Sequence, residues 1–403
     1  MKTAADIRKA NAFDVIRSLH AATDASRREL AESTGLSLAT VATICNLLLD
    51  AGLVVEASLE RAATGRPTTR LALNPAHGVV IGVDLAETYV HVETLNAALE
   101  PLSSTELVLD LHERSPRQIV SRIREAIETE QAKSDLPVLG IGVSAPGQVD
   151  QAGGTSVFAH NWEWRNVPLL EMLAETIDAP LYLDNPLKAL VLAELWSHPQ
   201  RGSQDFVIVN LGTGVGFGAA LQGGVLRGRT NSAGEWGHTV VVAGGRRCRC
   251  GARGCLEAYI GADGILQTVR ELAPGSHLLR GDDQTATIAA LAEGAASGDA
   301  DSAAVLDQVA WYLGIGLAGI VNVLNPEVVV IGGWVSRHLG EVLLERARPH
   351  IRSQALAVPL VAATFEIEHP RDNSVSLGAA ATALEGYLLS LPNGVTQSER
   401  SAG

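Results

Sequence analysis

Four side chains within a short stretch of the chain have the types and spacing of a metal site. They are spaced H-x9-C-x-C-x4-C and comprise His238, Cys248, Cys250 and Cys255. One imidazole and three thiolates suit tetrahedral zinc, and four protein ligands leave no open position for water. The alternative is a disulfide, but a Cys-x-Cys pair would close a strained ring. The remaining cysteine, Cys45, falls on an apolar helix face, so the sequence predicts one structural Zn2+ site.

The chain is long enough to form several domains with cores of their own. It has 403 residues, of which 46% are hydrophobic, and this length corresponds to about two to four domains. No uninterrupted apolar stretch reaches the roughly 20 residues of a membrane helix. The N-terminal residues lack the apolar core of a secretory signal. We therefore expect a cytoplasmic protein that does not contact a membrane.

The formal net charge of −14 is unevenly distributed along the chain. Residues 1–78 carry nine basic and eight acidic side chains, and the rest of the chain carries 22 basic and 37 acidic ones. An evenly spread acidic charge would argue against binding to nucleic acid. Because the N-terminal part is close to neutral, that argument applies only to the remainder of the chain.

The first fifty residues carry the signals of short helices. Apolar residues at helical spacing predict one helix over residues 9–19. Ser26 and Glu29 form a capping box that begins a second helix. Gly35 supplies the positive φ of a tight turn, and Ser37 caps a third helix. Two helices joined by a glycine-containing turn are typical of a helix-turn-helix unit.

Alternating residues after the third helix predict a hairpin. Residues 53–56 and 68–73 flank Gly65-Arg66-Pro67, which we interpret as a wing. In such a unit the second helix of the pair presents its N-terminal residues to base edges, and basic side chains contact phosphates. The candidate DNA-binding residues are Arg27, Arg28, Ser37, Thr40, Thr43 and Arg66. The alternative is a helical cap or dimerisation element, because residues 38–46 contain no Lys or Arg.

Two stretches of the remaining chain read as a strand, a tight turn and a second strand. Residues 79–102 have an acidic residue at the first turn, and residues 206–226 have glycines there. This repeated pattern resembles the architecture of actin-like ATPases and sugar kinases, in which backbone amides at the turns cradle phosphates.

Five motifs together resemble, in order and spacing, the ROK family, which groups bacterial repressors, uncharacterised reading frames and sugar kinases. They are GVSAPGQVD (142–150), LGTGVGFG (211–218), AGEWGH (233–238), CRCGARGCLE (248–257) and NPEVVVIGG (325–333). Repressor members of the xylose and N-acetylglucosamine type carry an N-terminal winged helix-turn-helix with a GRP wing and an L-x-L-N-P junction. Both are present here, and the resemblance covers nearly the whole chain.

The resemblance implies an α/β fold with an actin-like, two-lobed body behind a winged helix-turn-helix domain. We expect the DNA-binding domain over residues 1–75, an N-terminal lobe over 76–200 and a C-terminal lobe with the zinc loop over 201–392. Residues 393–403 are expected to form a disordered tail.

The resemblance also implies a sugar site. Family kinases contact the sugar through an Asn-Asp pair, a Glu three residues before the zinc histidine, that histidine, and a Glu that follows Cys-Leu. With the Asn of an N-x-x-W stretch, the matching positions are Asn161, Asn185, Glu235, His238 and Glu257. Carboxylates and imidazole suit the hydroxyl groups of a sugar. The two acids could instead be solvated, and the neighbouring Trp162 and Trp164 could be core residues.

Three departures from the family pattern concern phosphoryl transfer. Pro186 stands where the kinases have their general-base Asp, a group worth about 10²–10⁴ in rate. The phosphate turn, D-x-G-G-T in the kinases, here runs over residues 84–88 as DLAET. Trp334 stands where a smaller residue usually lies beside adenine. The resemblance therefore implies that this chain is not an enzyme.

The leading hypothesis is a sugar-responsive DNA-binding transcriptional regulator, a repressor of carbohydrate-metabolism genes. Its expected partners are operator DNA, a monosaccharide or amino-sugar effector, and further copies of itself in a homodimer or homotetramer. One alternative is a sugar kinase that uses ATP with Asp184 as an unusual base. Another is a scaffold whose N-terminal head only dimerises and whose body binds a protein partner.

Overall fold

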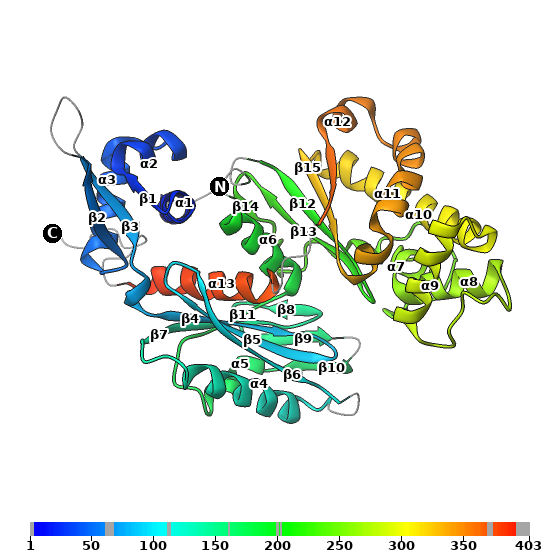
Figure 1. Ribbon diagram of the computed structural model, residues 1–403, viewed down its shortest axis with the longest axis horizontal. Helices are drawn as coiled ribbons and strands as arrows, with labels where there is room; N and C mark the ends of the chain where they lie inside the picture. The colour runs from blue at the N-terminus through cyan, green and yellow to red at the C-terminus, as the bar shows by residue number, and fades with distance from the viewer. Residues whose placement is uncertain are drawn as a thin grey trace. The chain divides into compact units, whose positions relative to one another are not determined.

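The computed structural model describes residues 4–60, 68–110, 114–159, 162–198, 201, 204–368 and 374–391. The chain forms two compact units (Figure 1). The first comprises Met1–Ser203 together with Asn373–Gly403, and the second comprises Gln204–Asp372. The end of the chain therefore belongs with its beginning. The predicted disordered tail, residues 393–403, lies outside the described residues.

The N-terminal head contains three helices, α1 (Ala4–Ala22), α2 (Arg27–Thr34) and α3 (Leu38–Asp50). The predicted capping box is confirmed, because the side chains of Ser26 and Glu29 each accept a hydrogen bond from the backbone N–H of the other residue. Gly35 adopts a φ of 67°, and Ser37 caps α3. The chain bends by 119° between α2 and α3, which lies within the range of helix-turn-helix units.

A three-stranded sheet completes the head. Its order is β1-β3-β2, from the strands β1 (Asp24–Ser26), β2 (Val54–Glu60) and β3 (Thr68–Leu73). The hairpin of β2 and β3 is confirmed, whereas the three-residue β1 was not predicted. Arg70 on β3 donates hydrogen bonds to Asp24 and Glu29, which ties the hairpin to the start of α2. The wing tip with Arg66 lies outside the described residues.

The body of the first unit is built on a five-stranded sheet of order β11-β7-β4-β5-β6. Its strands are β4 (Val79–Leu85), β5 (Tyr89–Asn96), β6 (Pro101–Val108), β7 (Val138–Ser144) and β11 (Leu181–Asp184). Helices α4 (Pro116–Gln131) and α13 (Ser374–Ser390) cover its opposite faces (Figure 1). The flanking elements are η1 (Pro75–His77), β8 (Gln148–Asp150), β9 (Thr155–Ala159), β10 (Trp164–Val167), α5 (Leu169–Ala174) and α6 (Pro186–Ser197).

Helix α13 packs directly on the backbone of this sheet. A Cβ atom at Gly142 would lie 1.8 Å from the Ala379 carbonyl oxygen, and one at Gly82 would lie 1.9 Å from the Ser376 carbonyl oxygen. Only glycine permits this approach at either position. The structure thus differs from the expected lobe of residues 201–392, because α13 returns to the first unit, a long-range contact that sequence order does not reveal.

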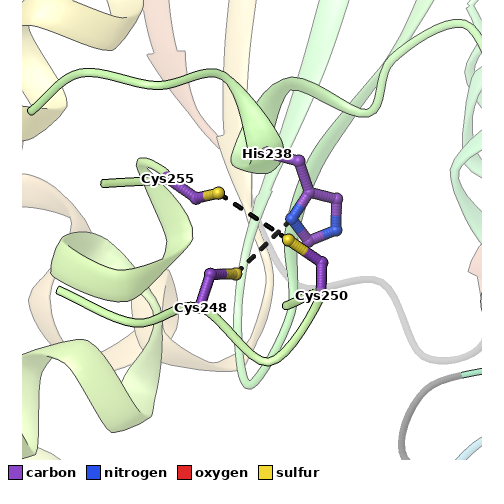
Figure 2. A group of neighbouring side chains, drawn as sticks. All are labelled: His238, Cys248, Cys250 and Cys255. Carbon is purple, nitrogen blue, oxygen red and sulfur yellow. Dashed lines mark hydrogen bonds between the residues drawn. The ribbon is translucent and has the colours of Figure 1, made fainter. Parts of the chain in front are cut away.

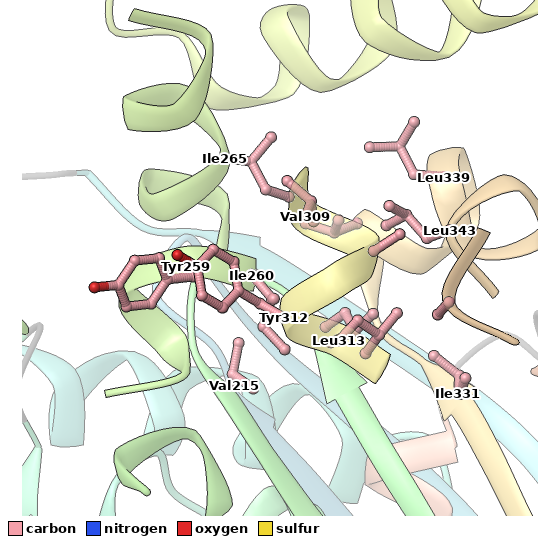
Figure 3. Packing of buried hydrophobic residues seen from close by; sticks show 14 of the residues in the cluster. Val215, Tyr259, Ile260, Ile265, Val309, Tyr312, Leu313, Ile331, Leu339 and Leu343 are labelled. Atoms are coloured by element: carbon pink, nitrogen blue, oxygen red, sulfur yellow. The ribbon is translucent and has the colours of Figure 1, made fainter. Parts of the chain in front are cut away.

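The second unit contains a five-stranded sheet of order β14-β13-β12-β15-β16. Its strands are β12 (Phe206–Leu211), β13 (Val215–Leu221), β14 (Gly224–Val225), β15 (Val328–Gly332) and β16 (Thr364–Ile367). Its helices are η4 (Trp236–His238), α7 (Glu257–Ile260), α8 (Ala262–Leu272), α9 (Gln284–Ser297), α10 (Ala300–Leu324), α11 (Trp334–Gln354) and α12 (Ala357–Ala362). Their apolar side chains form one core with the sheet (Figure 3).

Helix α10 is, by length and composition, able to cross a membrane. However, 67% of its apolar window is buried inside the second unit. Helices α2 and α3 would pass the same test only as one continuous span, which their bend of 119° contradicts. We interpret α10 as the central core helix of the second unit.

The packing of α13 generates a prediction about stability. Gly142→Ala is expected to lower the free energy of unfolding by at least about 2 kcal/mol, because the new methyl group overlaps a backbone carbonyl. The matched control is Gly319→Ala on α10, where a Cβ atom would have no neighbour within 4 Å. Alanine there should stabilise the helix by about 0.5–1 kcal/mol. Urea unfolding measures both, and two equal values would contradict the packing described.

Candidate functional site

His238, Cys248, Cys250 and Cys255 converge on one point in the second unit (Figure 2), and their ligand atoms all lie within 4.8 Å of one another. Cys248 Sγ is 3.7 Å from His238 Nδ1, and Cys250 Sγ is 3.7 Å from Cys255 Sγ. Zinc bonds of about 2.0–2.3 Å in a tetrahedron place the ligand atoms about 3.5–3.8 Å apart. The spacing therefore fits one tetrahedral ion of the size of zinc.

Close backbone contacts shape the loop that carries these ligands. Gly254 has a φ of 80°, and a Cβ atom there would lie 1.7 Å from the Val242 carbonyl oxygen. His238 ends the short helix η4. In the same helix, Trp236 is buried and donates its indole N–H to the Gly316 carbonyl oxygen at 3.2 Å. The core of the second unit thereby fixes the position of the histidine.

Burial opposes ionisation of the cysteine thiols when no cation is bound. Burial raises the pKa of Cys248 to about 12 and also raises the pKa of Cys255. A metal ion binds the thiolate form and supplies the opposite charge that a buried thiolate needs. The chemistry and the spacing of this donor set therefore agree.

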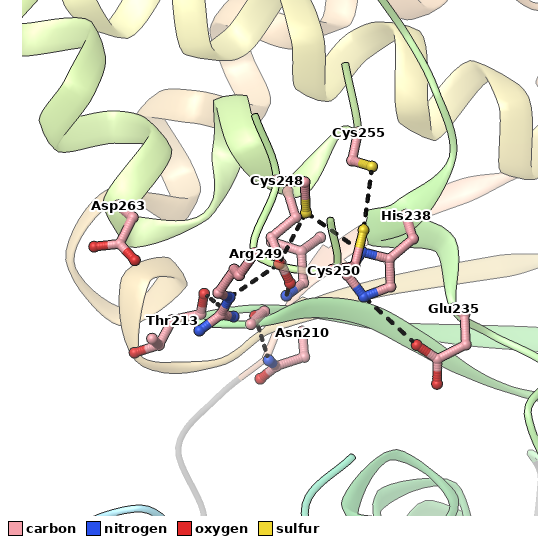
Figure 4. A network of polar contacts seen from close by, with 12 residues as sticks. Asn210, Thr213, Glu235, His238, Cys248, Arg249, Cys250, Cys255 and Asp263 are labelled. Atoms are coloured by element: carbon pink, nitrogen blue, oxygen red, sulfur yellow. Dashed lines mark hydrogen bonds and ion pairs between the residues drawn. The ribbon is translucent and has the colours of Figure 1, made fainter. Parts of the chain in front are cut away.

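The two nitrogen atoms of His238 face different groups (Figure 4). Nδ1 lies toward Cys248, and Nε2 lies 3.8 Å from a carboxylate oxygen of Glu235. The side chains of His238 and Glu235 are 34% and 39% exposed. A carboxylate behind a metal-binding imidazole fixes the orientation of the ring. The predicted residues Glu235 and His238 therefore lie together at the outer side of the metal cluster.

Glu257 is buried, and its carboxylate already has protein partners. Oε1 accepts a hydrogen bond from Arg249 Nε at 3.1 Å, and Oε2 accepts one from the Val215 backbone N–H at 3.0 Å. Burial would raise the pKa of Glu257, but Arg249 holds it below its ordinary value. Arg249 also donates to the Thr213 carbonyl oxygen at 2.8 Å (Figure 4). The interpretation of Glu257 as a solvated surface acid is therefore wrong.

Sequence reasoning missed Arg249 as the partner of Glu257. The arginine lies between two cysteine ligands, where a charge that neutralises thiolates is the simpler interpretation. Instead, Arg249 and Glu257 form an ion pair that stabilises the glycine turn at residues 212–214, because Arg249 bonds Thr213 and Glu257 bonds Val215. The available signal was the closeness of Arg249 to Glu257 in the sequence, because a carboxylate that becomes buried needs a partner.

Asn185 lies in the first unit, at the start of α6. Its side-chain oxygen accepts a hydrogen bond from the Leu187 backbone N–H at 2.9 Å, and its side-chain amide donates to the Gly147 carbonyl oxygen at 2.6 Å. Pro186 occupies the first turn of α6, where its missing N–H costs nothing. Asn185 therefore serves as a helix cap, and it joins α6 to the GVSAPGQVD turn.

The other aromatic and amide candidates of the first unit divide into two groups. Trp162 and Trp164 are buried in its core with their ring centroids 4.8 Å apart, so the core interpretation is confirmed for both. Asn161 lies outside the described residues.

The turn over residues 84–88 is closed by its own hydrogen bonds. The Ala86 backbone N–H donates to the Tyr89 carbonyl oxygen at 3.0 Å. The Tyr89 hydroxyl donates to Asp84 at 3.0 Å. Burial raises the pKa of Asp84 to about 6, although this hydrogen bond opposes the shift. The Ala86 amide is therefore used within the turn and is not available to bind a phosphate.

The glycine turn of the second unit is similarly occupied. A Cβ atom at Gly212 would lie 3.2 Å from the Trp334 ring, so the indole packs against this glycine. The Asn210 side-chain amide donates to the Gly214 carbonyl oxygen at 3.1 Å (Figure 4). Trp334 begins α11, which places its side chain over the turn.

The described DNA-binding candidates lie at the exposed side of α2 and α3. Ser37 and Thr40 hydrogen-bond one another at the N-terminus of α3, and the exposed Thr43 donates to the Ala39 carbonyl oxygen at 3.0 Å. The remaining two are basic, Arg27 and Arg28. Arg27 donates to Asn46 at 3.1 Å, and Arg28 pairs with Glu32 at 2.9 Å with its side chain 84% exposed.

Comparison with known proteins agrees with this geometry. The family model described as "ROK family" matches residues 80–385, and the model described as "Winged helix-turn-helix DNA-binding" matches residues 8–55. The chain belongs to the ROK family. With its winged helix-turn-helix, it is a transcriptional regulator of that family with a mixed α/β, actin-like body.

Two proteins that match this ROK protein over nearly their full length are regulators. The chain is 28% identical to the xylose repressor of Caldicellulosiruptor bescii, over 90% of this chain and 92% of the relative. A crystal structure of a ROK transcriptional regulator, a homologue of the E. coli Mlc protein, matches with a TM-score of 0.78 and 26% identity. That match covers 94% of this chain and 97% of the other. The glucokinase of Halalkalibacterium halodurans is 34% identical, but the match covers less of this chain: 71% of this chain and 89% of the relative.

The metal cluster predicts a dependence of the second unit on a bound ion. Removal of the ion by a chelator, or Cys255→Ser, is expected to lower the melting temperature by at least about 5 °C, because the ligands hold the loop closed. Cys45→Ser is the control for the loss of a buried thiol at another site. Metal analysis should find one zinc per chain in the Cys45 variant and none in the Cys255 variant. Equal zinc content in both would contradict the assigned ligand set.

Asp84 predicts a pH-dependent stability difference. Above pH 6 the folded protein holds a buried charged carboxyl group, whereas the unfolded chain ionises near the ordinary pKa of 3.8. Asp84→Asn should therefore raise the free energy of unfolding by about 2 kcal/mol at pH 7.5. The gain should shrink as the pH falls from 6 toward 4, where the wild-type group becomes neutral. Urea unfolding across this range tests it, with the exposed Asp178→Asn as control; a loss of stability at pH 7.5 would contradict it.

Proposed function

We propose that this ROK regulator is a sugar-responsive repressor of carbohydrate-metabolism genes and has no kinase activity. The observation that carries the proposal is the combination of an intact helix-turn-helix with a closed phosphate turn in one chain. Relatives matched over nearly their full length support it, because they are named as repressors. The proposed cellular location is the cytoplasm, where operator DNA is accessible.

The proposed DNA contacts are those of the α3 N-terminus and the neighbouring arginines. Thr43, Ser37 and Thr40 would face base edges, and Arg27, Arg28 and Arg66 would contact phosphates. Because the net charge of the head is close to neutral, a single copy is expected to bind DNA only weakly. Two heads in a homodimer or homotetramer raise the affinity through effective concentration. A symmetric pair of heads is expected to bind an operator that contains an inverted repeat.

The proposed effector is a monosaccharide or amino sugar. Glu235 and His238 supply exposed polar groups beside the metal cluster in the second unit, and Asn161, Asn185 and Glu257 are the further candidates from the family pattern. Zn2+ is the proposed ion of the His-Cys cluster. With four protein ligands it would have a structural role, holding His238 in a fixed position.

Three observations support the loss of phosphoryl transfer. Pro186 offers no proton acceptor at the position of the family's base. The amide of Ala86 is used within its own turn. The indole of Trp334 covers Gly212 in the second glycine turn. We propose that each departure favours the regulator over the kinase.

We also propose that the domains follow the expected boundaries, except that α13 returns to the first unit.

A matched pair of threonine variants tests DNA recognition. Thr43 and Thr129 are both exposed, and both donate to the carbonyl oxygen four residues earlier on their helices. Thr43→Ala should weaken binding to an operator fragment selected from random DNA by about 5–100-fold, because it removes a proposed base contact. Thr129→Ala on α4 should leave the affinity unchanged. Fluorescence anisotropy at fixed salt measures both, and equal affinities would argue against α3 as the reading helix.

The alternative of a sugar kinase has its own test. Asp184 is buried beside Asn185, whose backbone N–H donates to it at 2.8 Å. Purified protein with Mg-ATP should release no ADP above background with xylose, glucose or N-acetylglucosamine. Sugar-dependent ADP release that is lost in Asp184→Asn would instead establish the kinase.

A further inference from the structure

The head is joined to the body of the first unit by a buried cluster that we call the Arg17 junction, formed by Arg17, His20, Trp196 and Glu385. Arg17 Nη2 donates to Glu385 Oε1 at 2.5 Å, and the Trp196 indole N–H donates to the same oxygen at 3.4 Å. The His20 ring stands edge-on to Trp196, with centroids 5.6 Å apart. One carboxylate thus connects α1 of the head with α6 and α13 of the body.

The junction is largely shielded from water. The side chains of Arg17 and Glu385 are 10% and 14% exposed, and Trp196 is fully buried. The Arg17 guanidinium also lies over the Trp196 ring, 5.8 Å from its centroid. An ion pair buried in this way resists separation, because each charge would remain out of water without its partner. We therefore expect the junction to be either closed or open, with few intermediate arrangements.

A second contact attaches η1, the segment that connects the head to the body, to α13. The Nε2 atom of His77 in η1 lies 2.7 Å from the hydroxyl oxygen of Tyr387. Tyr387 follows Glu385 by two residues on α13. Any movement of α13 relative to the head must therefore displace both contacts.

Helix α6 links this junction to a proposed effector residue. It begins directly after Asn185, ends at Ser197, and with 12 residues is about 18 Å long. A Cβ atom at Gly378 would lie 1.8 Å from the Ala189 carbonyl oxygen, so α6 and α13 touch backbone to backbone. Because close-packed elements transmit strain to one another, α6 and α13 are expected to move together. A displacement at Asn185 therefore reaches Trp196 at the other end.

We propose that Glu385 is a positioning residue that couples effector binding at the start of α6 to the DNA-reading head. Resting on the proposed function, this inference assigns the route of regulation within one chain. Effector contacts with Asn185 shift α6 together with α13, Glu385 moves relative to Arg17, and the orientation of α1 changes with it. The operator affinity then depends on whether the junction is closed.

The first test needs no effector. Glu385→Gln removes the charge but keeps the shape. Trp196→Phe removes the N–H contact while keeping a smaller aromatic ring, and it serves if the first variant does not fold. The matched control is Glu194→Gln, on the same helix, whose carboxylate pairs with Arg201 at 3.0 Å. Hydrogen exchange of the full-length protein should be about tenfold or more faster over residues 8–50 in the junction variants. In the control variant, the exchange rate over residues 8–50 should match wild type. Over β4 and β7, the exchange rate should match wild type in every variant.

The second test measures coupling. The ratio of operator affinities with and without sugar should be about 5–150-fold in wild type and in Glu194→Gln. It should fall below about twofold in the junction variants. The probes are xylose, glucose and N-acetylglucosamine, and the thermal shift caused by the active sugar should be unchanged in every variant.

The outcomes separate this inference from the proposed function. Wild-type protein without any sugar response refutes the proposed effector, while the exchange experiment still decides whether the junction holds the head. Exchange over residues 8–50 that is equal in all variants overturns the inference. A junction variant with the full wild-type coupling ratio also overturns it.

Discussion

The first unit depends on the absence of side chains where α13 crosses the sheet. At Gly82 and Gly142 the carbonyl oxygens of α13 occupy the space that a Cβ atom would need. This approach fixes the height of α13, and therefore the positions of Glu385 and Tyr387, which hold the head. A displacement of α13 would change both its packing on the sheet and its contacts with the DNA-binding head.

The same fold that supports phosphoryl transfer in kinases here carries turns that are internally satisfied. Tyr89 bonds the carboxyl group of Asp84, and Trp334 packs on Gly212. These contacts satisfy the polar groups of the turns without a nucleotide. Meanwhile the Arg249–Glu257 pair and the metal ligands hold the loops of the second unit. A regulator needs a stable body, because the arrangement of the head should change only when an effector binds one state of the protein more tightly than the other.

Features that depend on neighbouring residues were predictable from the sequence. The capping box of Ser26 and Glu29, the turn at Gly35 and the metal spacing each follow from local geometry. Contacts between distant residues were not predictable in this way. The pairing of Arg17 with Glu385, the return of α13 and the three-residue β1 depend on the folded chain. Of the sugar candidates, the sequence did not reveal that Asn185 and Glu257 already have protein partners.

Regulation of carbohydrate genes by this chain requires that it bind specific DNA. The most direct measurement is sequencing of the genomic fragments that the purified protein retains at physiological salt. We expect enrichment of a few inverted repeats, with half-sites spaced by one helical turn or a multiple of it, upstream of genes for sugar uptake or breakdown. Retention of fragments without any common sequence would rule out specific DNA binding by this chain.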